Sequence, residues 1–316
     1  MAERILVTGA AGFAGSHLVQ HLAATRAVTA WARSAPPAAI TDLATWQRVD
    51  LMHRDEVHAA IASVRPAVVF HCAGSPHVGS SWHDSATPLA NNVIGTHHLL
   101  EALHAERLRA RVLITGSATV YAPSERPIRE DDRVNPVSPY ALSKFAQERL
   151  GLRAVTEDGL EVVVTRSFNH TGPRQTAAFV APSMARQIAL IERGGAEPVI
   201  RVGNLDARRD ITDVRDVVRA YDLLAGAGVA GQLYNVASGT ARSMREVLQG
   251  LLARATRPIA VEIDPARLRP HDTPVLVGDA SRLREHTAWQ PEIPFERMLD
   301  ELLDWWRAAV AANPAA

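Results

Sequence analysis

Short β-rich runs alternate with segments of helical periodicity along most of the chain. The six runs cover residues 5–8, 28–31, 67–71, 111–115, 161–166 and 232–236. Helical spacing of apolar residues appears in three intervening segments, residues 15–24, 88–106 and 139–156. Such alternation is typical of a parallel sheet that is covered by helices on both faces. We therefore expect an α/β fold with a doubly wound parallel sheet of the Rossmann type.

The pattern becomes irregular after Ser167. Gly, Pro and Arg cluster in residues 169–174, 194–203 and 265–274, which indicates a smaller C-terminal unit built partly of ligand-binding loops. A chain of 316 residues, 47% of them apolar, is long enough for two moderate cores. The predicted division assigns residues 1–167 and 211–237 to the Rossmann domain and residues 168–210 and 238–316 to a substrate-binding domain. The last helix repeats apolar residues on one face, which predicts packing on the core: Phe295, Met298, Leu299, Leu302 and Trp306.

The charges of the chain balance, with 34 Lys and Arg against 34 Asp and Glu. No global field therefore draws the protein to nucleic acid or to an anionic membrane. Cys72 is the only cysteine, which excludes internal disulfides and multi-cysteine metal sites and fits a reducing cytoplasm. We find no histidines at metal-ligand spacing, no targeting segment and no window approaching the roughly 18 apolar residues of a membrane span. The sequence predicts a cytoplasmic protein without a metal.

A glycine-rich turn, residues 9–15 with the sequence GAAGFAG, follows the first apolar run and opens a helix. Glycines allow the backbone to turn tightly and to approach a diphosphate, and the helix N-terminus offers unpaired N–H groups and a positive dipole end. The position in the first strand-turn-helix unit favours dinucleotide binding over an ordinary tight loop. The predicted contacts come from Gly9, Gly12, Phe13, Ala14 and Gly15.

The second run ends in Arg33 and Ser34, where a grip on a free ribose 2′-hydroxyl would need Asp or Glu. An arginine and a serine suit a 2′-phosphate better. The sequence therefore favours NADP(H) over NAD(H), although Arg33 is also one of many arginines that a surface would carry.

Lys144 is the only lysine, so the other 33 of the 34 basic residues are arginines. A chain that uses Arg for nearly every positive charge points to Lys144 for a task that needs a compact ammonium with a tunable pKa. Tyr140 lies one helical turn earlier on the same face, because Ser138-Pro139 predicts the start of a helix there. A phenol whose pKa is lowered by an ammonium can protonate an alkoxide as a ketone is reduced. With Ser117 at the end of a predicted strand, the three form the candidate catalytic set.

At these motifs the chain resembles the extended short-chain dehydrogenase/reductases over nearly its whole length. Further matching motifs are Asp50-Leu51, His71-Cys72-Ala73-Gly74 and Asn92-Val93-Ile94-Gly95-Thr96. The resemblance implies that a further set of residues lines the cofactor cleft with Tyr140 and Lys144: Asp50, Leu51, Cys72, Ala73, Gly74 and Asn92. It also implies a homodimer in which helices near residues 88–106 and 139–156 pair across a two-fold axis.

Loops of the second half resemble those of enzymes that act on GDP-linked hexoses, namely GDP-mannose 4,6-dehydratases and GDP-4-keto-6-deoxymannose reductases. The segments are residues 167–174, 202–210 and 268–272. Arginines there would fork onto diphosphate oxygens, for which Arg209 and Arg269 are the candidates. The resemblance implies these substrate-binding residues: Val78, Ser80, Ser117, Asn169, Arg174, Val202, Asn204, Arg209 and Arg269. A GDP-linked sugar is the expected substrate.

Three functions stay open on this basis. The first is NAD(P)H-dependent reduction of the 4-keto group of GDP-4-keto-6-deoxy-D-mannose to a GDP-6-deoxyhexose such as GDP-D-rhamnose. The second is a GDP-mannose 4,6-dehydratase, or another nucleotide-sugar dehydratase or epimerase, and the third is an NADP-binding sensor without turnover. In the related dehydratases an acid follows the catalytic Ser or Thr by two residues, whereas here that position is Thr119. A hydroxyl cannot act as a base near neutral pH, so the sequence favours the reductase.

Overall fold

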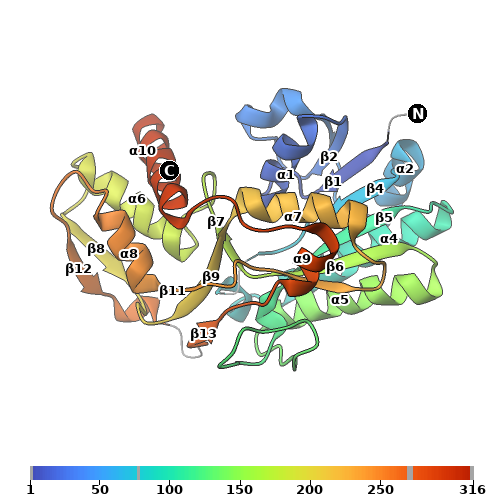
Figure 1. The fold of residues 1–316 in the computed structure, drawn as a ribbon. Helices are drawn as coiled ribbons and strands as arrows, with labels where there is room; N and C mark the ends of the chain where they lie inside the picture. Colours follow the sequence, from blue (N-terminus) through green and yellow to red (C-terminus); the bar gives the residue numbers. More distant parts are fainter. Residues whose placement is uncertain (1–2, 77–78, 269–272, 314–316) are drawn as a thin grey trace.

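The structure, a computed structural model, describes residues 3–76, 79–268 and 273–313. Its main sheet has seven parallel strands in the order β10-β6-β5-β4-β1-β2-β3 (Figure 1). The strands are β1 (Ile5–Thr8), β2 (Val28–Ala32), β3 (Thr45–Arg48), β4 (Val68–His71), β5 (Arg111–Ser117), β6 (Glu161–Ser167) and β10 (Leu233–Val236). The predicted runs match β1, β2, β4, β5, β6 and β10, and the doubly wound Rossmann fold is confirmed.

Helices cover both faces of this sheet, and each face has its own apolar core. On one face pack α1 (Phe13–Ala23), α7 (Val214–Ala227) and α9 (Ser281–Thr287). On the other pack α2 (Arg54–Val64), α4 (Gly95–Ala105) and α5 (Pro139–Glu157). Strands such as β4, whose four residues are all buried, lie between two helical layers, which explains their continuous apolar sequence.

The helix predicted over residues 88–106 consists of three pieces. They are α3 (Ala86–Leu89), a π-helical turn η3 (Ala90–Ile94) and α4. In the wide turn Asn92 is fully buried, and its side chain forms hydrogen bonds with Ser75 in the loop after β4 and with Ser143 on α5. These tertiary bonds account for a local break in α-helical geometry, and such π turns are frequent at functional sites.

The second unit lies beside the sheet, on the left in Figure 1. Its core joins α6 (Val180–Glu192), α8 (Met244–Leu252) and α10 (Phe295–Ala312) to β8 (Val199–Val202). The short strands complete it: β7 (Asn169–Thr171), β9 (Arg208–Asp213), β11 (Ala241–Ser243), β12 (Ala260–Ile263) and β13 (Val275–Leu276). The segment after Ser167 is thus more regular than its sequence predicts. The predicted stripe on α10 is buried except at its partly buried first member, Phe295.

The predicted domain boundary at residue 211 falls inside β9, which pairs with β7, β11 and β13 rather than with the main sheet. α7 and β10 then return to the Rossmann unit. The remaining short helices are η1 (Ala38–Leu43), η2 (Ser80–Trp82), η4 (Ala118–Val120) and η5 (Pro265–Arg267).

Candidate active site

The turn between β1 and α1 passes close to the end of β4. Gly9 has a φ of +65°, and a Cβ atom there would lie 2.6 Å from the backbone of Ala73. A Cβ atom on Gly15 would lie 2.2 Å from the carbonyl oxygen of Gly9. Both positions therefore require glycine. α1 begins after Gly12 without a side-chain cap, so its first N–H groups are left for a ligand, and this backbone fits the diphosphate of a dinucleotide.

A pocket of about 250 Å³ opens beside this turn. It is lined by several predicted cofactor-binding residues: Gly9, Gly12, Arg33, Ser34, Asp50, Leu51, Cys72, Ala73 and Gly74. Phe13, Ala14 and Gly15 form the first turn of α1, whereas Asn92, Tyr140 and Lys144 lie on η3 and α5, outside this lining. Asn91 also lines the pocket and was not predicted; its amide donates to Ser75 Oγ over 2.9 Å.

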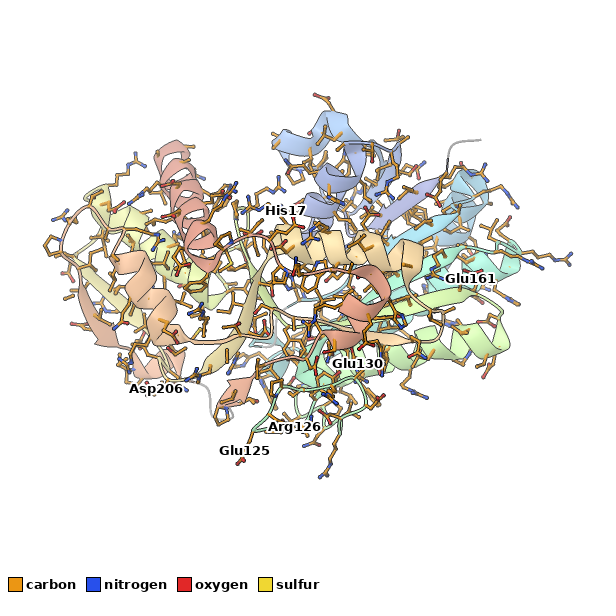
Figure 2. All side chains as sticks on the ribbon, viewed as in Figure 1. His17, Glu125, Arg126, Glu130, Glu161 and Asp206 are labelled. Carbon is orange, nitrogen blue, oxygen red and sulfur yellow. The ribbon has the colours of Figure 1, made fainter. Side chains whose placement is uncertain are left out.

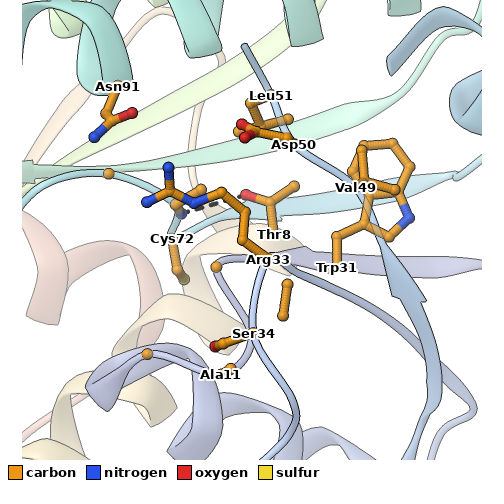
Figure 3. A pocket seen from close by; sticks show the side chains of 15 residues that line it. Thr8, Ala11, Trp31, Arg33, Ser34, Val49, Asp50, Leu51, Cys72 and Asn91 are labelled. Atoms are coloured by element: carbon orange, nitrogen blue, oxygen red, sulfur yellow. Dashed lines mark hydrogen bonds between the residues drawn. The ribbon is translucent and has the colours of Figure 1, made fainter. Parts of the chain in front are cut away.

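Arg33 and Ser34 are exposed at the end of β2. Figure 3 shows the Arg33 side chain extending across the pocket. Asp50 in the pocket wall accepts a hydrogen bond from the backbone N–H of Met52 over 3.1 Å, so part of its carboxylate serves its own loop. The end of β2 thus offers a positive charge and a hydroxyl, which suit a phosphate monoester.

Ser117 and Tyr140 meet where β5 ends against α5. Both are nearly buried, and burial raises the pKa of the Tyr140 phenol, while a hydrogen bond with Ser117 lowers it. Ser117 Oγ lies 2.9 Å from Thr119 Oγ1. The phenol therefore keeps its proton at neutral pH in the cofactor-free protein, and it is hydrogen-bonded to the Ser117 hydroxyl.

Lys144 is buried one turn further along α5, with 7% of its surface exposed. Its ammonium donates to the carbonyl oxygen of Thr115 and to Oε1 of Gln147, both over 2.6 Å. Burial lowers the pKa of Lys144 from 10.5 to about 8, and the nearby Cys72 acts in the opposite direction. No direct hydrogen bond joins Lys144 to Tyr140 in the part of the chain that the structure describes. The sequence analysis missed Gln147, which no local pattern distinguishes.

Asn92 connects α5 to the loop after β4. Its Nδ2 donates to Ser143 Oγ over 2.8 Å, and Ser143 Oγ in turn donates to the carbonyl oxygen of Tyr140 over 2.7 Å. Its Oδ1 accepts from the backbone N–H of Ser75 over 2.8 Å. A Cβ atom on Gly74 would lie 2.3 Å from that oxygen, so the loop approaches Asn92 as closely as a glycine permits. Asn92 thus fixes α5 relative to the loop that lines the first pocket.

A second, larger cavity of about 520 Å³ lies in the second unit. Four predicted substrate-binding residues line it: Asn169, Val202, Asn204 and Arg209. Arg201 and Arg267 line it as well. Neither was singled out, because nothing local separates them from the other arginines. Three guanidinium groups in one cavity wall make it suited to a diphosphate.

The remaining predicted substrate-binding residues lie elsewhere. Arg174 is outside the cavity lining and donates to Gln20 Oε1 on α1 over 3.0 Å. It lies at the junction of the two units, where Figure 2 labels the neighbouring His17, whose pKa is lowered to about 4 by burial and by Arg174. Ser80 begins η2, next to Ser81, whose Oγ accepts from the backbone N–H of Tyr140 over 3.3 Å. Val78 and Arg269 lie outside the described residues.

Carboxylates are scarce around both spaces. Among the described residues, Asp50 is the only acidic residue that lines the first pocket, and the second cavity has none in its lining. Within the same ranges no three His, Cys, Asp or Glu side chains gather in a way that would hold a metal ion. None of the described helices is long and apolar enough to cross a membrane.

Comparison with known proteins agrees with this geometry. Residues 6–302 match the family model described as GDP-mannose 4,6 dehydratase. The chain is 37% identical over 313 residues to the GDP-6-deoxy-D-mannose reductase of Pseudomonas aeruginosa, covering 98% of this chain and 99% of that protein.

Solved structures show the same similarity. RMD from Pseudomonas aeruginosa, complexed with NADPH, has a TM-score of 0.86 and 34% identity, covering 98% of this chain and all of that one. UDP-glucose 4-epimerase of Thermus thermophilus, in complex with NAD, has a TM-score of 0.84 and 30% identity, covering 97% of this chain and 100% of that one.

Proposed function

The chain belongs to the GDP-mannose 4,6-dehydratase family, and within that family we propose that it is an NADPH-dependent reductase. The reaction is reduction of the 4-keto group of GDP-4-keto-6-deoxy-D-mannose to a GDP-6-deoxyhexose such as GDP-D-rhamnose. The proposal is supported by the whole-length similarity to a GDP-6-deoxy-D-mannose reductase and by the chemistry of the residues around Tyr140. The enzyme is an NAD(P)-dependent oxidoreductase.

The protein's own residues supply the proton of this reduction. When bound, the reduced nicotinamide supplies a hydride to the carbonyl carbon of the sugar. Tyr140 donates its phenolic proton to the carbonyl oxygen, and Ser117 donates a hydrogen bond to the same oxygen as charge develops on it. The Lys144 ammonium stabilises the resulting phenolate, and a proton from solvent restores the phenol. The balance is one ketone, one NADPH and one proton consumed for one alcohol and one NADP⁺.

The observation that carries the reductase assignment is the hydroxyl of Thr119, 2.9 Å from Ser117 Oγ. The elimination of water by a dehydratase needs a carboxylate to move protons beside the catalytic hydroxyl. Thr119 cannot do this near neutral pH. Reduction needs no such group.

The preference for NADP(H) over NAD(H) is part of the proposal. Arg33 and Ser34 line the cofactor pocket at the end of β2, where a 2′-phosphate would meet a cation and a hydroxyl. The similar RMD was solved with NADPH, whereas other similar structures carry NAD.

The substrate proposal is a GDP-linked sugar bound in the larger cavity. Arg201, Arg209 and Arg267 would neutralise its diphosphate, and Asn204 would bind a ribose or base edge. Neither nucleic acid nor a membrane is expected as a partner.

A homodimer and a cytoplasmic location complete the proposal. Exposed apolar side chains support pairing of the helices near residues 88–106 and 139–156 with a second copy: Leu89 on α3, Ile94 on η3, Val137 just before α5 and Leu142 on α5. Leu142, at 50% exposure on α5, is the residue to test. Leu142→Glu should shift the protein to monomer in sedimentation.

Two incubations test the function. Purified protein should consume NADPH when given GDP-4-keto-6-deoxymannose, and mass spectrometry should show a gain of two hydrogen atoms in the sugar. It should leave GDP-mannose unchanged in the presence of NADP⁺. Loss of water from GDP-mannose would overturn the reductase in favour of a dehydratase, and no NADPH consumption with any sugar nucleotide would favour a sensor. Tyr140→Phe, which removes only the phenolic oxygen, is the matched control.

A further inference from the structure

A row of buried polar side chains extends from Lys144 into the Rossmann sheet. Lys144 Nζ donates to Gln147 Oε1 over 2.6 Å, and Gln147 Nε2 donates to Thr96 Oγ1 on α4 over 2.8 Å. His71 at the end of β4 contacts Thr96 Oγ1 through Nε2 and Thr8 Oγ1 through Nδ1, both over 2.8 Å. Gln147, Thr96, His71 and Thr8 each have 0% of their surface exposed. Solvent therefore has no share in these bonds.

The proton positions in this row follow from one bond. The Thr96 hydroxyl donates to the carbonyl oxygen of Asn92 over 2.7 Å, so its oxygen only accepts from the other partners. Gln147 must then present its NH₂ to Thr96, and His71 must carry its proton on Nε2. The Nδ1 atom of His71 accepts from the Thr8 hydroxyl. Each amide and imidazole orientation is thereby fixed by its neighbour.

A fixed amide gives Lys144 a fixed acceptor. Because the NH₂ of Gln147 is held by Thr96, its oxygen can face only the ammonium. His71 stays neutral, since burial and the Lys144 charge lower its pKa to about 3. Two of the three Lys144 N–H groups are thus used by Thr115 and Gln147, and among the described residues the third has no partner.

Few ionisable groups surround Lys144. Tyr140 precedes it on α5, and His71 and Cys72 face it from the end of β4. Glu148, next to Gln147 on the helix, is used in a buried ion pair with Arg166 of β6. Among the described residues only Cys72 adds a charge interaction that affects the Lys144 pKa. A change at Gln147 should therefore be readable in the titration of Lys144.

We propose that Gln147 is a positioning residue for the reduction: its amide, locked by Thr96 and His71, orients the Lys144 ammonium so that its third N–H serves the reacting site. The inference rests on the proposed role of Lys144. Its first test does not need the substrate, because the chain contains a single lysine.

Protein labelled with carbon-13 at the lysine ε-carbon gives one side-chain NMR signal, which reports the titration of Lys144 directly. The cofactor-free wild type should titrate near pH 8. Gln147→Leu removes an acceptor from the charged form and should lower the midpoint by about one pH unit. If Gln147 only fills space, the loosened packing of this variant would admit water and raise the midpoint toward the ordinary 10.5.

Gln147→Glu tests the direction in which the titration midpoint of Lys144 moves. A carboxylate beside the ammonium favours the charged form and should raise the midpoint above that of the wild type. Gln249→Leu, at an exposed position on α8 of the second unit, is the matched control and should leave it unchanged. A midpoint in Gln147→Leu that rises, or that stays within about 0.3 unit of the wild type, would overturn the proposal.

Kinetics give the second test. Gln147→Leu should lower kcat at pH 8 about tenfold, leave KM for the sugar nucleotide unchanged, and move the alkaline limb of the pH profile with the NMR midpoint. An alkaline limb of the pH profile that does not shift with the NMR midpoint of Lys144 would overturn the positioning role. If the wild type consumes no NADPH while the midpoints move as stated, the orientation of Lys144 stands and the reductase assignment falls.

Discussion

Lys144 should make the stability of the cofactor-free protein depend on pH in a direction that is unusual for a lysine. Burial lowers the pKa of Lys144 from 10.5 to about 8 in the folded protein. Between these values the unfolded chain holds the proton and the folded chain does not, so the free energy of unfolding rises with pH. Below about pH 8 Lys144 is protonated in both the folded and the unfolded chain, so its contribution to the free energy of unfolding no longer changes with pH.

The size of the effect follows from the pKa difference. A shift from 10.5 to about 8 corresponds to about 3 kcal/mol over the full range, at about 1.4 kcal/mol per unit. Between pH 7 and pH 9.5 only the part above the folded pKa is gained, which is about 2 kcal/mol. Lys144 is 7% exposed, so solvent screening does not reduce this value greatly.

Urea unfolding of the wild type and of Lys144→Met at both pH values isolates this contribution. Other groups, such as the Cys72 thiol whose pKa is raised to about 12, titrate in both proteins and cancel in the difference. We expect the wild type to gain about 2 kcal/mol relative to the variant as the pH is raised. A difference between the two proteins that stays constant would refute the argument that the ammonium is desolvated.

Three further predictions concern activity and folding. Lys144→Arg should lower kcat about 100-fold or more, because a planar guanidinium cannot replace the compact ammonium. Tyr140→Phe should lower kcat by a similar factor, because it removes the proton donor. Steady-state NADPH consumption measures both variants. Arg33→Asp should shift the ratio of dissociation constants toward NADH, and equal affinity of the wild type for NADH and NADPH would contradict the phosphate contact. Glu148→Ala should lower the free energy of unfolding by about 3–5 kcal/mol in chemical unfolding, since it leaves the buried Arg166 without its carboxylate partner. A loss below about 1 kcal/mol would be incompatible with the buried pair.

The parts of the fold that local sequence determines were predictable. Six strands of the main sheet are apolar runs, and α5 begins where Ser138 and Pro139 predict it, with Ser138 Oγ accepting from Ala141 N. The sequence does not delimit β3 (Thr45–Arg48), because this edge strand has half-exposed polar side chains and no continuous apolar run. The start of α8 carries a local signal that the sequence analysis does not use. Ser243 and Glu246 form a capping box there.

The parts that depend on distant contacts were not predictable. The π turn around Asn92 depends on bonds to Ser75 and Ser143, 17 and 51 residues away in sequence. Gln147 becomes significant only because α4 places Thr96 against it. Likewise, Arg201 acquires a candidate role only when the fold places it in the wall of a cavity. The candidate catalytic set of Ser117, Tyr140 and Lys144 could be proposed from the sequence, because helical spacing and a single lysine are properties of the sequence itself.

The way in which the second unit is assembled determines how the protein responds to chain cleavage. Its core combines α6, α8 and α10, while α7 and β10, which lie between α6 and α8 in the sequence, belong to the Rossmann unit. A single nick in an exposed loop, such as that around Gly194 and Gly195, would therefore release neither unit. The two fragments would each contain pieces of both cores and would remain associated until the whole protein unfolds.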